Sequence, residues 1–358
     1  APNIDINSVS NLSVIKGAGA LQYSGDAVGG VIIAETLKVP VKDSLYGKSL
    51  MTTTTNGRGL SLSSQLTKSY ENGWHATLQG TVKRFGDFEA PDYILSNTGV
   101  YERNISVKVG FNRFDYGIEG YYSRFKNELG ILSASHLGGA RDQVRALESN
   151  IPLIIKDFTY TIKAPRQDVT HHLATIKGFK RFESFGKLNF QYDFQRNNRL
   201  EYDIRRGDDK NKASSDLQLD THTVLLDLES HLTDAIILKS GIMTKYQNNF
   251  ANPNTGVRRL IPDYDMYDLG LYFIVDYQLN DQLLLEAGGR YDYSYMDVFK
   301  FYKTSFWESR NYDQRFPEIV VEELSTQILT NPQLNFSNGS GTLGATYAFS
   351  EDYKLFFN

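Results

Sequence analysis

The sequence predicts an all-β protein, specifically an antiparallel up-and-down transmembrane β-barrel. Three observations indicate this fold. From about Leu45 to the end of the chain, segments with alternating apolar and polar residues follow one another. Short polar turns and long loops alternate strictly between these segments, as they do in outer-membrane barrels. The 23 Tyr and 21 Phe residues, against 2 Trp, crowd the segment ends, where membrane interfaces favour aromatic rings.

The connections between the alternating segments fall into two length classes. Short turns are expected at 71–73, 114–117, 183–186, 233–235, 280–282 and 350–352, and long loops near 86–102, 126–168, 200–215, 249–263 and 298–334. Because neighbouring antiparallel strands run in opposite directions, the two classes lie at opposite ends of the sheet. A meander with all tight turns at one end and all large loops at the other is typical of an outer-membrane barrel.

The two faces of each predicted strand differ in polarity. Along one segment, Leu269, Leu271, Phe273, Val275 and Tyr277 share a face, because successive side chains of a strand point to opposite sides. In a soluble sandwich this face would fill a core, whereas in a barrel it would contact lipid. The segments 187–199 and 264–278 are longer than the five or six residues usual for a sandwich strand, which favours the barrel.

The number of strands predicts an incomplete barrel. We count about thirteen alternating segments, and the last of them, 353–358, is short. Single-chain bacterial barrels have even strand numbers, so we expect the chain to be a fragment at its C-terminus. The first and last strands then do not pair with each other, unless another segment bridges them. No signal peptide precedes Ala1, so either it was removed or the chain begins inside a longer protein.

Composition excludes several classes of protein. The chain has 358 residues and is 41% hydrophobic, yet its mean hydropathy of -0.39 and the lack of an 18-residue apolar run exclude a helical membrane protein. A net charge of -4, with no basic cluster interleaved with aromatics, gives no indication of nucleic-acid binding. The absence of cysteine excludes a disulfide scaffold and thiolate metal sites.

The first forty residues follow a different pattern, which is rich in glycine and small side chains. They predict a strand, a tight glycine-dependent turn, a short helical or looped piece and a second strand. A phosphate-binding loop is the rival interpretation. The glycines Gly17, Gly19 and Gly25 fit neither GxGxxG nor the P-loop, which also needs a Lys-Ser/Thr pair, so we reject it.

This region resembles the end of the plug domain of TonB-dependent outer-membrane receptors. The similarity lies in the strings Val14-Ile15-Lys16-Gly17, Ala20-Leu21-Gln22-Tyr23 and Ala27-Val28-Gly29-Gly30-Val31-Ile32, with Ser24-Gly25-Asp26 as a small departure. About 25 residues carry it, and the alternating segments that follow fit the barrel of the family. The resemblance implies a structural role for seven residues: Lys16, Gly17, Leu21, Tyr23, Gly25, Gly29 and Gly30.

The resemblance implies a location, an activity and partners. In that family a barrel of about 22 strands encloses the plug, so residues 1–40 would be the C-terminal end of the plug and residues 41–358 the N-terminal part of the barrel. Residues 9–36 would then lie against the inner wall. The protein would sit in the bacterial outer membrane and import a scarce nutrient, such as a ferric siderophore or another metal complex. TonB, with its ExbB–ExbD energising complex, would act through a TonB box absent from this sequence. No cofactor is implied.

The long loops supply the candidate ligand-binding residues. Arginines combined with aromatic rings suit an anionic, aromatic chelate, although charged loops are often merely hydrated. Helix is expected near 141–149 and within 316–330. His136 lies in the first of the loops concerned. The candidates are Arg141, Arg145, Arg205, Arg206, Tyr302, Trp307, Arg310 and Arg315.

No set of residues indicates an enzyme or a metal centre. His171 and His172 are adjacent on a predicted strand, so at most one of them faces the interior and they cannot share one ion without a bulge. His222 and His231 lack a carboxylate or cysteine at ligand spacing. Besides a receptor, a passive outer-membrane pore and a surface adhesion or assembly barrel remain open alternatives.

Overall fold

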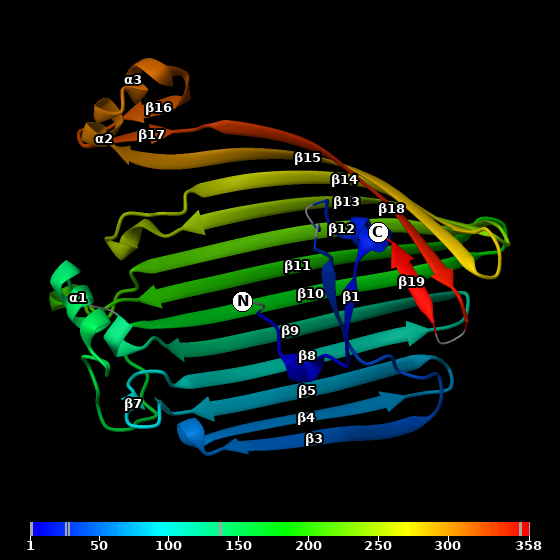
Figure 1. Cartoon of the computed structure of the whole chain (residues 1–358), viewed down its shortest axis with the longest axis horizontal. Coiled ribbons are helices and arrows are strands. Elements are labelled where there is room, and N and C mark those ends of the chain that lie inside the picture. Colours follow the sequence, from blue (N-terminus) through cyan, green and yellow to red (C-terminus); the bar gives the residue numbers. More distant parts are fainter. Residues whose placement is uncertain (1–2, 26, 28, 136–137, 351–352, 358) are drawn as a thin grey trace.

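Most of the chain forms one large antiparallel sheet that curves into a wall (Figure 1). The structure is a computed structural model and describes residues 3–25, 27, 29–135, 138–350 and 353–357. The sheet has 15 strands in this described part. Two of them, β16 (Val320–Glu323) and β17 (Gln327–Thr330), belong to an outer loop, which leaves thirteen strands in the wall. The predicted antiparallel meander of about thirteen strands is confirmed.

The wall strands follow one another in chain order, and every neighbouring pair is antiparallel. At the two margins, β3 pairs with β4 and β19 with β18, and no described segment bridges β3 to β19. The wall strands are β3 (Ser44–Thr54), β4 (Gly59–Ser69), β5 (Trp74–Phe85), β8 (Val100–Asn112), β9 (Tyr116–Gly130), β10 (Arg166–Phe182), β11 (Gly186–Tyr202), β12 (Ser215–Thr233), β13 (Ile236–Ala251), β14 (Asp263–Gln278), β15 (Leu283–Lys303), β18 (Gln333–Ala348) and β19 (Lys354–Phe357).

The connections alternate as predicted. Short turns join the strands at the right-hand end of Figure 1, and the long loops gather at the left-hand end. Each expected turn falls between two wall strands, to within a few residues, although residues 351–352 of the last one lie outside the described part. One long loop contains the small hairpin β6 (Phe88–Glu89) and β7 (Ile94–Leu95).

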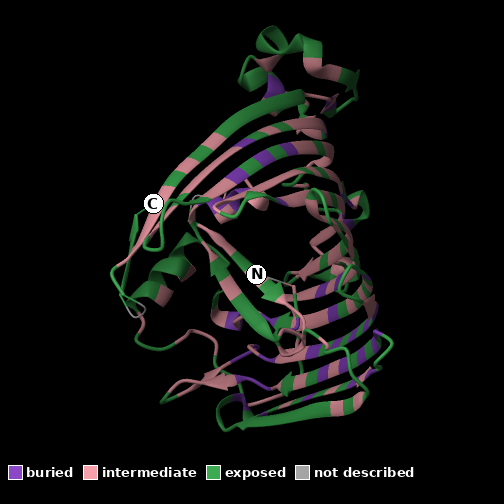
Figure 2. Cartoon of the chain, turned by 90° about the vertical axis from the view of Figure 1, so that its right-hand side faces the viewer, coloured by how far each residue is buried: buried purple, intermediate pink, exposed green. Residues whose placement is uncertain are grey.

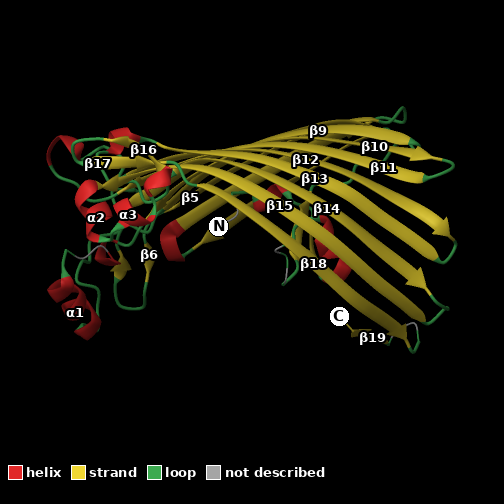
Figure 3. Ribbon diagram, turned by 90° about the horizontal axis from the view of Figure 1, so that it is seen from above, coloured by secondary structure: helices red, strands yellow, loops and turns green. Residues whose placement is uncertain are grey.

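The α-helices of the described part are short and lie at the long-loop end (Figure 3). The predicted helix near 141–149 is confirmed as α1 (Ala140–Glu148). The helix predicted within 316–330 is limited to one 3-10 turn, Pro317–Ile319, and the rest of that segment forms the hairpin β16–β17 instead. The helices α2 (Thr304–Ser309) and α3 (Tyr312–Arg315) precede it. No helix in the described part is long and apolar enough to span a membrane.

Along much of the wall, buried polar side chains on the concave side alternate with exposed apolar side chains on the convex side. This order is the reverse of that in a soluble protein, which buries its apolar face. Strand β5 illustrates the pattern: its polar side chains are buried and its apolar ones are exposed. The buried residues are His75, Thr77, Gln79 and Thr81, and the exposed ones are Trp74, Leu78 and Val82.

Strand β14 gives a length for the outward apolar surface. Tyr267 and Tyr277 bound a row of apolar side chains on one face of this strand, and Leu269, Leu271, Phe273 and Val275 lie between them. The ten residue steps from Tyr267 to Tyr277 span about 33 Å along the strand. With the tilt of about 40° usual in such barrels, this corresponds to roughly 25 Å along the barrel axis, the height of the apolar band of an outer-membrane barrel.

Aromatic residues mark the long-loop edge of this outward surface. One cross-strand row contains an aromatic side chain on each of five neighbouring strands, in direct register from β11 to β15. Their ring centroids are 4.9–6.3 Å apart. The row consists of Phe194, His222, Tyr246, Tyr267 and Tyr295.

The described residues among the first forty lie in the hollow of the wall (Figure 2). They form β1 (Asn11–Ile15), a turn of 3-10 helix η2 (Gly17–Gln22) and β2 (Val31–Glu35), with β1 and β2 antiparallel. The predicted order of strand, turn, short helical piece and strand is confirmed. Within the predicted range 9–36, η2 contacts the inner face of β14, β15 and β18, and Thr36 at the other end accepts a hydrogen bond from Lys108 of β8. We call residues 3–40 the inner segment. The proposed domain boundary at residue 40 stays a prediction.

Candidate functional site

The turn η2 rests on the inner face of β14, β15 and β18. Its Ala18 forms a buried cluster with Tyr272 and Ile274 of β14. Leu21 is also buried and approaches Gly288 of β15 so closely that a Cβ there would lie 2.9 Å from the Leu21 Cδ1 atom. Because glycine has no side chain, the backbone of the wall can meet the inner segment directly. We call this contact region the seat.

A buried arginine joins the seat to the wall. The Arg290 side chain is 0% exposed. Its Nε and Nη2 donate to the Asp292 carboxylate at 2.6–2.9 Å, and its Nη1 donates to the Leu21 carbonyl oxygen at 2.8 Å. Two glycines leave room for this pair, since a Cβ on Gly270 would lie 2.0 Å from the Arg290 Nη2 atom and one on Gly25 would lie 2.1 Å from the Asp292 Oδ2 atom.

A second group of contacts holds the ends of the inner segment on the opposite part of the wall. Gln79 of β5 donates from Nε2 to the Asp5 carboxylate at 2.8 Å, and both side chains are buried. Lys108 of β8 donates from Nζ to the Leu37 carbonyl oxygen and to Thr36 Oγ1. The inner segment is therefore held by few polar contacts at each of two places.

The local backbone explains the residue type at several positions of the plug motif. Gly17 and Gly30 adopt positive φ values of 69° and 103°, which favour glycine. A Cβ on Gly30 would also lie 2.6 Å from the Ile15 carbonyl oxygen. Lys16 is the extended residue that precedes η2. By contrast, a Cβ on Gly29 would meet nothing within 4 Å.

The remaining motif residues lie at the seat itself. Leu21 and Gly25 contact the wall as described above, and Val28 lies outside the described residues. Tyr23 follows η2. Its pKa is raised from the usual value by burial and by the nearby carboxylates of Asp227 and Glu35, so its phenol stays protonated at neutral pH.

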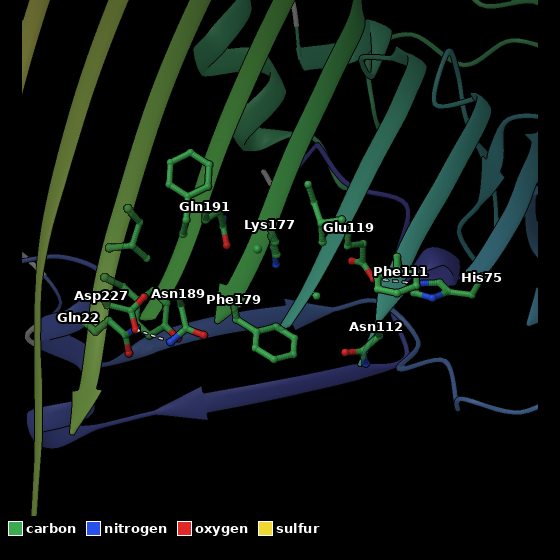
Figure 4. A pocket seen from close by; sticks show the side chains of 16 residues that line it. Gln22, His75, Phe111, Asn112, Glu119, Lys177, Phe179, Asn189, Gln191 and Asp227 are labelled. Carbon is green, nitrogen blue, oxygen red and sulfur yellow. Dashed lines mark hydrogen bonds and ion pairs between the residues drawn. The ribbon is translucent and has the colours of Figure 1, made fainter. Parts of the chain in front are cut away.

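A cavity of about 370 Å³ separates the inner segment from the wall near the short turns (Figure 4). Gln22 and Tyr23 close one side of it. The wall contributes side chains of both charges, among them Lys177, Glu119 and Asp227. Asn189 donates from Nδ2 to the Asp227 carboxylate at 3.0 Å. This polar space lies beside the seat, on the side away from the long loops.

The arginines predicted on the loops 126–168 and 200–215 do not form one site. Arg141 and Arg145 lie on α1, where Arg145 is ion-paired with Asp142 at 3.2 Å. Arg205 donates to the Thr255 carbonyl oxygen at 2.8 Å and thereby ties two loops together, and Arg206 is exposed. Figures 1 and 3 place α1 apart from α2 and α3. His136 lies outside the described residues.

The aromatic residues predicted on the last long loop do cluster. Tyr302, Phe306, Trp307, Tyr312 and Phe316 have neighbouring ring centroids 5.2–6.4 Å apart. Trp307 is 2% exposed, so it supports the cluster from within and presents no free surface to a ligand.

Two of the predicted arginines border this cluster. The guanidinium of Arg310 lies 5.5 Å from the centroid of Phe306, and that of Arg315 lies 5.1 Å from the centroid of Phe316. These distances suit cation–π attraction. Whether either arginine contacts a ligand stays a prediction.

Beside the cluster lies a cleft of about 550 Å³ between the β13–β14 loop and the end of β15. Neither Asp nor Glu is among the described residues that line it. Arg258 extends over the ring of Phe306 at 5.7 Å, while Arg259 is ion-paired with Asp263 at 2.8 Å. The charged and aromatic lining consists of Arg258, Arg259, Lys300, Lys303, Phe299, Phe301 and Tyr302. We call this the basic cleft.

Sequence reasoning missed the four cations of the basic cleft. The signal available was the Arg258-Arg259 doublet inside the predicted loop 249–263, and the two lysines that flank Phe301-Tyr302. Only the strand register brings the loop next to the end of β15, since β14 begins at Asp263 opposite Phe299.

The adjacent histidines are separated as predicted. His171 faces the interior and lies 3.3 Å from Asn197 Nδ2, whereas His172 faces outward and shares a hydrogen bond with the Tyr122 hydroxyl at 2.9 Å. Within the ranges that the structure describes, no group of three or more His, Cys, Asp or Glu residues could hold a metal ion.

Comparison with known proteins identifies the fold. No protein-family model matches the sequence, and no curated protein matches it. Among solved structures, the copper transporter OprC matches with a TM-score of 0.67 and 13% identity, over 98% of this chain and 49% of that one. The ferric-catecholate import receptor Fiu from E. coli K12 matches with a TM-score of 0.68 and 13% identity, over 96% and 58%. The FrpB iron transporter from Neisseria meningitidis matches with 0.67 and 15%, over 97% and 51%.

The named solved structures are all TonB-dependent outer-membrane receptors, and this chain shares their fold. It spans about half the length of the structures that it matches. By their titles these neighbours are transporters and receptors, not enzymes.

Proposed function

We propose that the protein is a TonB-dependent outer-membrane receptor that imports an anionic, aromatic metal chelate, such as a ferric siderophore. The basic cleft is the observation that carries this proposal. It combines four cations, of which only Arg259 is ion-paired with a carboxylate (Asp263) in the described part, with three aromatic rings, and no carboxylate is among its described lining residues. Guanidinium and ammonium groups attract anionic oxygens, and aromatic faces stack on planar ligand rings.

The location in the outer membrane is supported by the polarity of the wall. On the outward face of β14, Tyr267 and Tyr277 bound a row of apolar side chains. Such a surface is unfavourable in water and favourable in a hydrocarbon layer about 25 Å thick. The inner face contains charged pairs, among them Lys83 with Glu102 at 2.8 Å, which suit a hydrated interior.

The seat supports energised import over a passive pore. The inner segment lies in the hollow of the wall, where it would obstruct a channel. Its polar contacts to β15 are concentrated on Arg290, which donates to the carbonyl oxygens of Leu21 and Gln22. A pull from TonB, with its ExbB–ExbD complex, would break these contacts and open a path past the cavity of Figure 4.

The ligand proposal is tested by binding and growth. Wild-type protein should bind a ferric tris-catecholate complex, and Arg258→Gln/Lys300→Gln should bind it about tenfold more weakly, because each ion pair with a ligand contributes roughly 0.5–1 kcal/mol at an exposed site. Arg145→Gln/Arg206→Gln is the matched control with the same loss of charge. Equal binding by wild type and the cleft variant would refute the ligand assignment.

Growth distinguishes import from the alternatives. A deletion strain is compared with its parent on defined iron, haem and cobalamin sources, each with and without functional TonB. A defect on one source that also requires TonB supports the receptor. Growth equal to the parent on every source removes nutrient import for these classes, and uptake that persists without TonB indicates a passive pore.

A further inference from the structure

Four cations form a patch on the outward face of the wall at its long-loop end. They are Arg84 of β5, Arg103 of β8, and Arg124 and Lys126 of β9. Their outward direction follows from the strand pattern: Glu102 and Asn104, which flank Arg103, are buried on the inner face. We call these four residues the outer cationic patch.

The patch begins where the outward apolar surface ends. Two residues along each strand towards the short turns, the outward positions are Val82, Ile105 and Tyr122, and all three are exposed. Neighbouring strands are about 4.8 Å apart, so the patch from β5 to β9 is roughly 10–15 Å wide. In a bilayer this level is the boundary between hydrocarbon and headgroups.

The patch contains a pair of like charges that does not stabilise the fold. Arg103 and Lys126 are directly opposite each other in the β8–β9 register, and like charges in that position destabilise a sheet. Within the described part of the chain, no carboxylate forms an ion pair with any of the four cations. Arg84 and Arg103 lie instead over the ring of Tyr101, at 5.3 and 4.7 Å.

Other charged residues along the long-loop edge of the outward surface have hydrogen-bond partners within the protein. Arg196 of β11 makes two hydrogen bonds to Asp220 of β12. Asp265 of β14 accepts hydrogen bonds from Tyr246 and Asn248. The four cations of the outer cationic patch differ from Arg196 and Asp265 in that none of them is ion-paired with a carboxylate in the part of the chain that the structure describes.

We infer that the outer cationic patch binds the phosphate headgroups of anionic lipids in the outer leaflet of the membrane. The inference rests on the outer-membrane location proposed above. A lipid fits better than a soluble anion because its acyl chains would cover the adjoining apolar surface while its phosphate meets the cations. Arg binds phosphate through two parallel hydrogen bonds, and each basic residue near a membrane surface contributes about 1 kcal/mol to binding of anionic lipid.

The test removes the like-charge pair with Arg103→Gln/Lys126→Gln. This variant relieves a repulsion, so it should fold at least as stably as wild type. Its affinity for phosphatidylglycerol should nevertheless fall about 25-fold, roughly fivefold for each charge removed. Protein purified from its membrane is titrated with phosphatidylglycerol or phosphatidylcholine in mixed micelles, and bound lipid is counted by native mass spectrometry.

Two controls make the result specific. Arg113→Gln/Lys180→Gln removes the same charge from exposed residues at the short-turn end of the wall, and it should bind phosphatidylglycerol within twofold of wild type. Inorganic phosphate at the same concentration should not compete. Competition by phosphate alone would overturn the lipid assignment.

The remaining outcomes separate this inference from the proposed function. Equal binding of phosphatidylglycerol by wild type and the patch variant overturns the patch inference only. Failure of wild type to bind either lipid, together with its extraction from membranes by urea, overturns both the patch inference and the membrane location on which it rests.

Discussion

The seat and the basic cleft lie on the same strands but are built in opposite ways. At the seat, Arg290 is buried and every polar group of its side chain meets a fixed partner. At the cleft, Lys300 and Lys303 lie at the end of the same strand β15, partly exposed and without an acidic lining residue nearby. About 33 Å of strand separates Arg290 from Lys300.

This difference indicates two roles: the seat holds the inner segment in place, and the basic cleft attracts a ligand. Buried, charge-assisted hydrogen bonds are strong and directional, so they fix one arrangement of the inner segment. Exposed cations without counter-charges contribute little to folding but attract an anionic ligand. Substitutions at the seat should therefore change stability and leave first contact with a ligand intact, and substitutions at the cleft should do the reverse.

The largest effect is expected for Arg290→Met. The Asp292 carboxylate would lose its partner and the inner segment would lose its bond through the Leu21 carbonyl oxygen, at a cost of about 2–3 kcal/mol to docking. The chain has no cysteine, so a single Ala18→Cys reporter allows clean labelling by a maleimide. Labelling should become at least tenfold faster in the Arg290→Met background.

Lys303→Gln is the matched control from the cleft and should leave the labelling rate of the reporter unchanged. If Arg290→Met does not accelerate labelling, Arg290 does not hold the seat and the contrast between the two regions fails.

A smaller effect is expected for Gly25→Ala. The added methyl would lie 2.1 Å from the Asp292 Oδ2 atom, and overpacking of this kind costs about 1–3 kcal/mol. Gly29→Ala is a close control, because a Cβ there meets nothing within 4 Å and its φ is not positive. Thermal unfolding in detergent, measured for the two variants side by side, should show a lower midpoint for Gly25→Ala alone.

The strands and turns could be predicted from the sequence because each strand carries its own pattern. The alternation along β14, for instance, needs no information from other strands to indicate which residues share a face. The glycines Gly17 and Gly30 were likewise recognisable, since a positive φ is a local requirement.

The end of the chain's last long loop could not be predicted in the same way. Pro317 followed by several glutamates is typical of a helix start. The structure instead pairs Val320–Glu323 with Gln327–Thr330, which in turn pairs with the end of β15. The stabilising contacts come from a strand that is distant in sequence, so tertiary pairing overrides the local signal.

The basic cleft was missed for a related reason. Arg258 and Lys300 are separated by more than forty positions in the sequence, and they become neighbours only through the register of β14 with β15. The sequence indicated the right kind of residue for the ligand site, an arginine near aromatic rings, but the candidates chosen included Arg141 and Arg205 and not Arg258. Arg141 is exposed on α1, apart from the cleft, and Arg205 donates to the Thr255 carbonyl oxygen and so holds two loops together.

Salt should distinguish the two regions further. The Debye length falls from about 10 Å at 0.1 M salt to about 3 Å at 1 M. Binding of an anionic chelate at the exposed cleft should weaken about tenfold over that range, while labelling of Ala18→Cys at the buried seat should change less than twofold. Equal sensitivity at both places would show that the seat is not shielded from solvent. A neutral analogue of the chelate is the control, because its binding should not depend on salt.

The smallest effect concerns coupling between the two regions. If a ligand in the basic cleft binds better when the inner segment has left its seat, then linkage requires that loosening the seat raises ligand affinity by the same factor. Arg290→Met loosens the seat without touching the cleft, so it should raise affinity for the chelate about fivefold, at the low end of typical coupling energies of 1–3 kcal/mol. The ligand should in turn accelerate labelling of Ala18→Cys about fivefold in wild type. Unchanged ligand affinity together with an unchanged labelling rate would mean that the two regions are not thermodynamically coupled, although both include β15. Release of the inner segment would then depend on the pull from TonB alone.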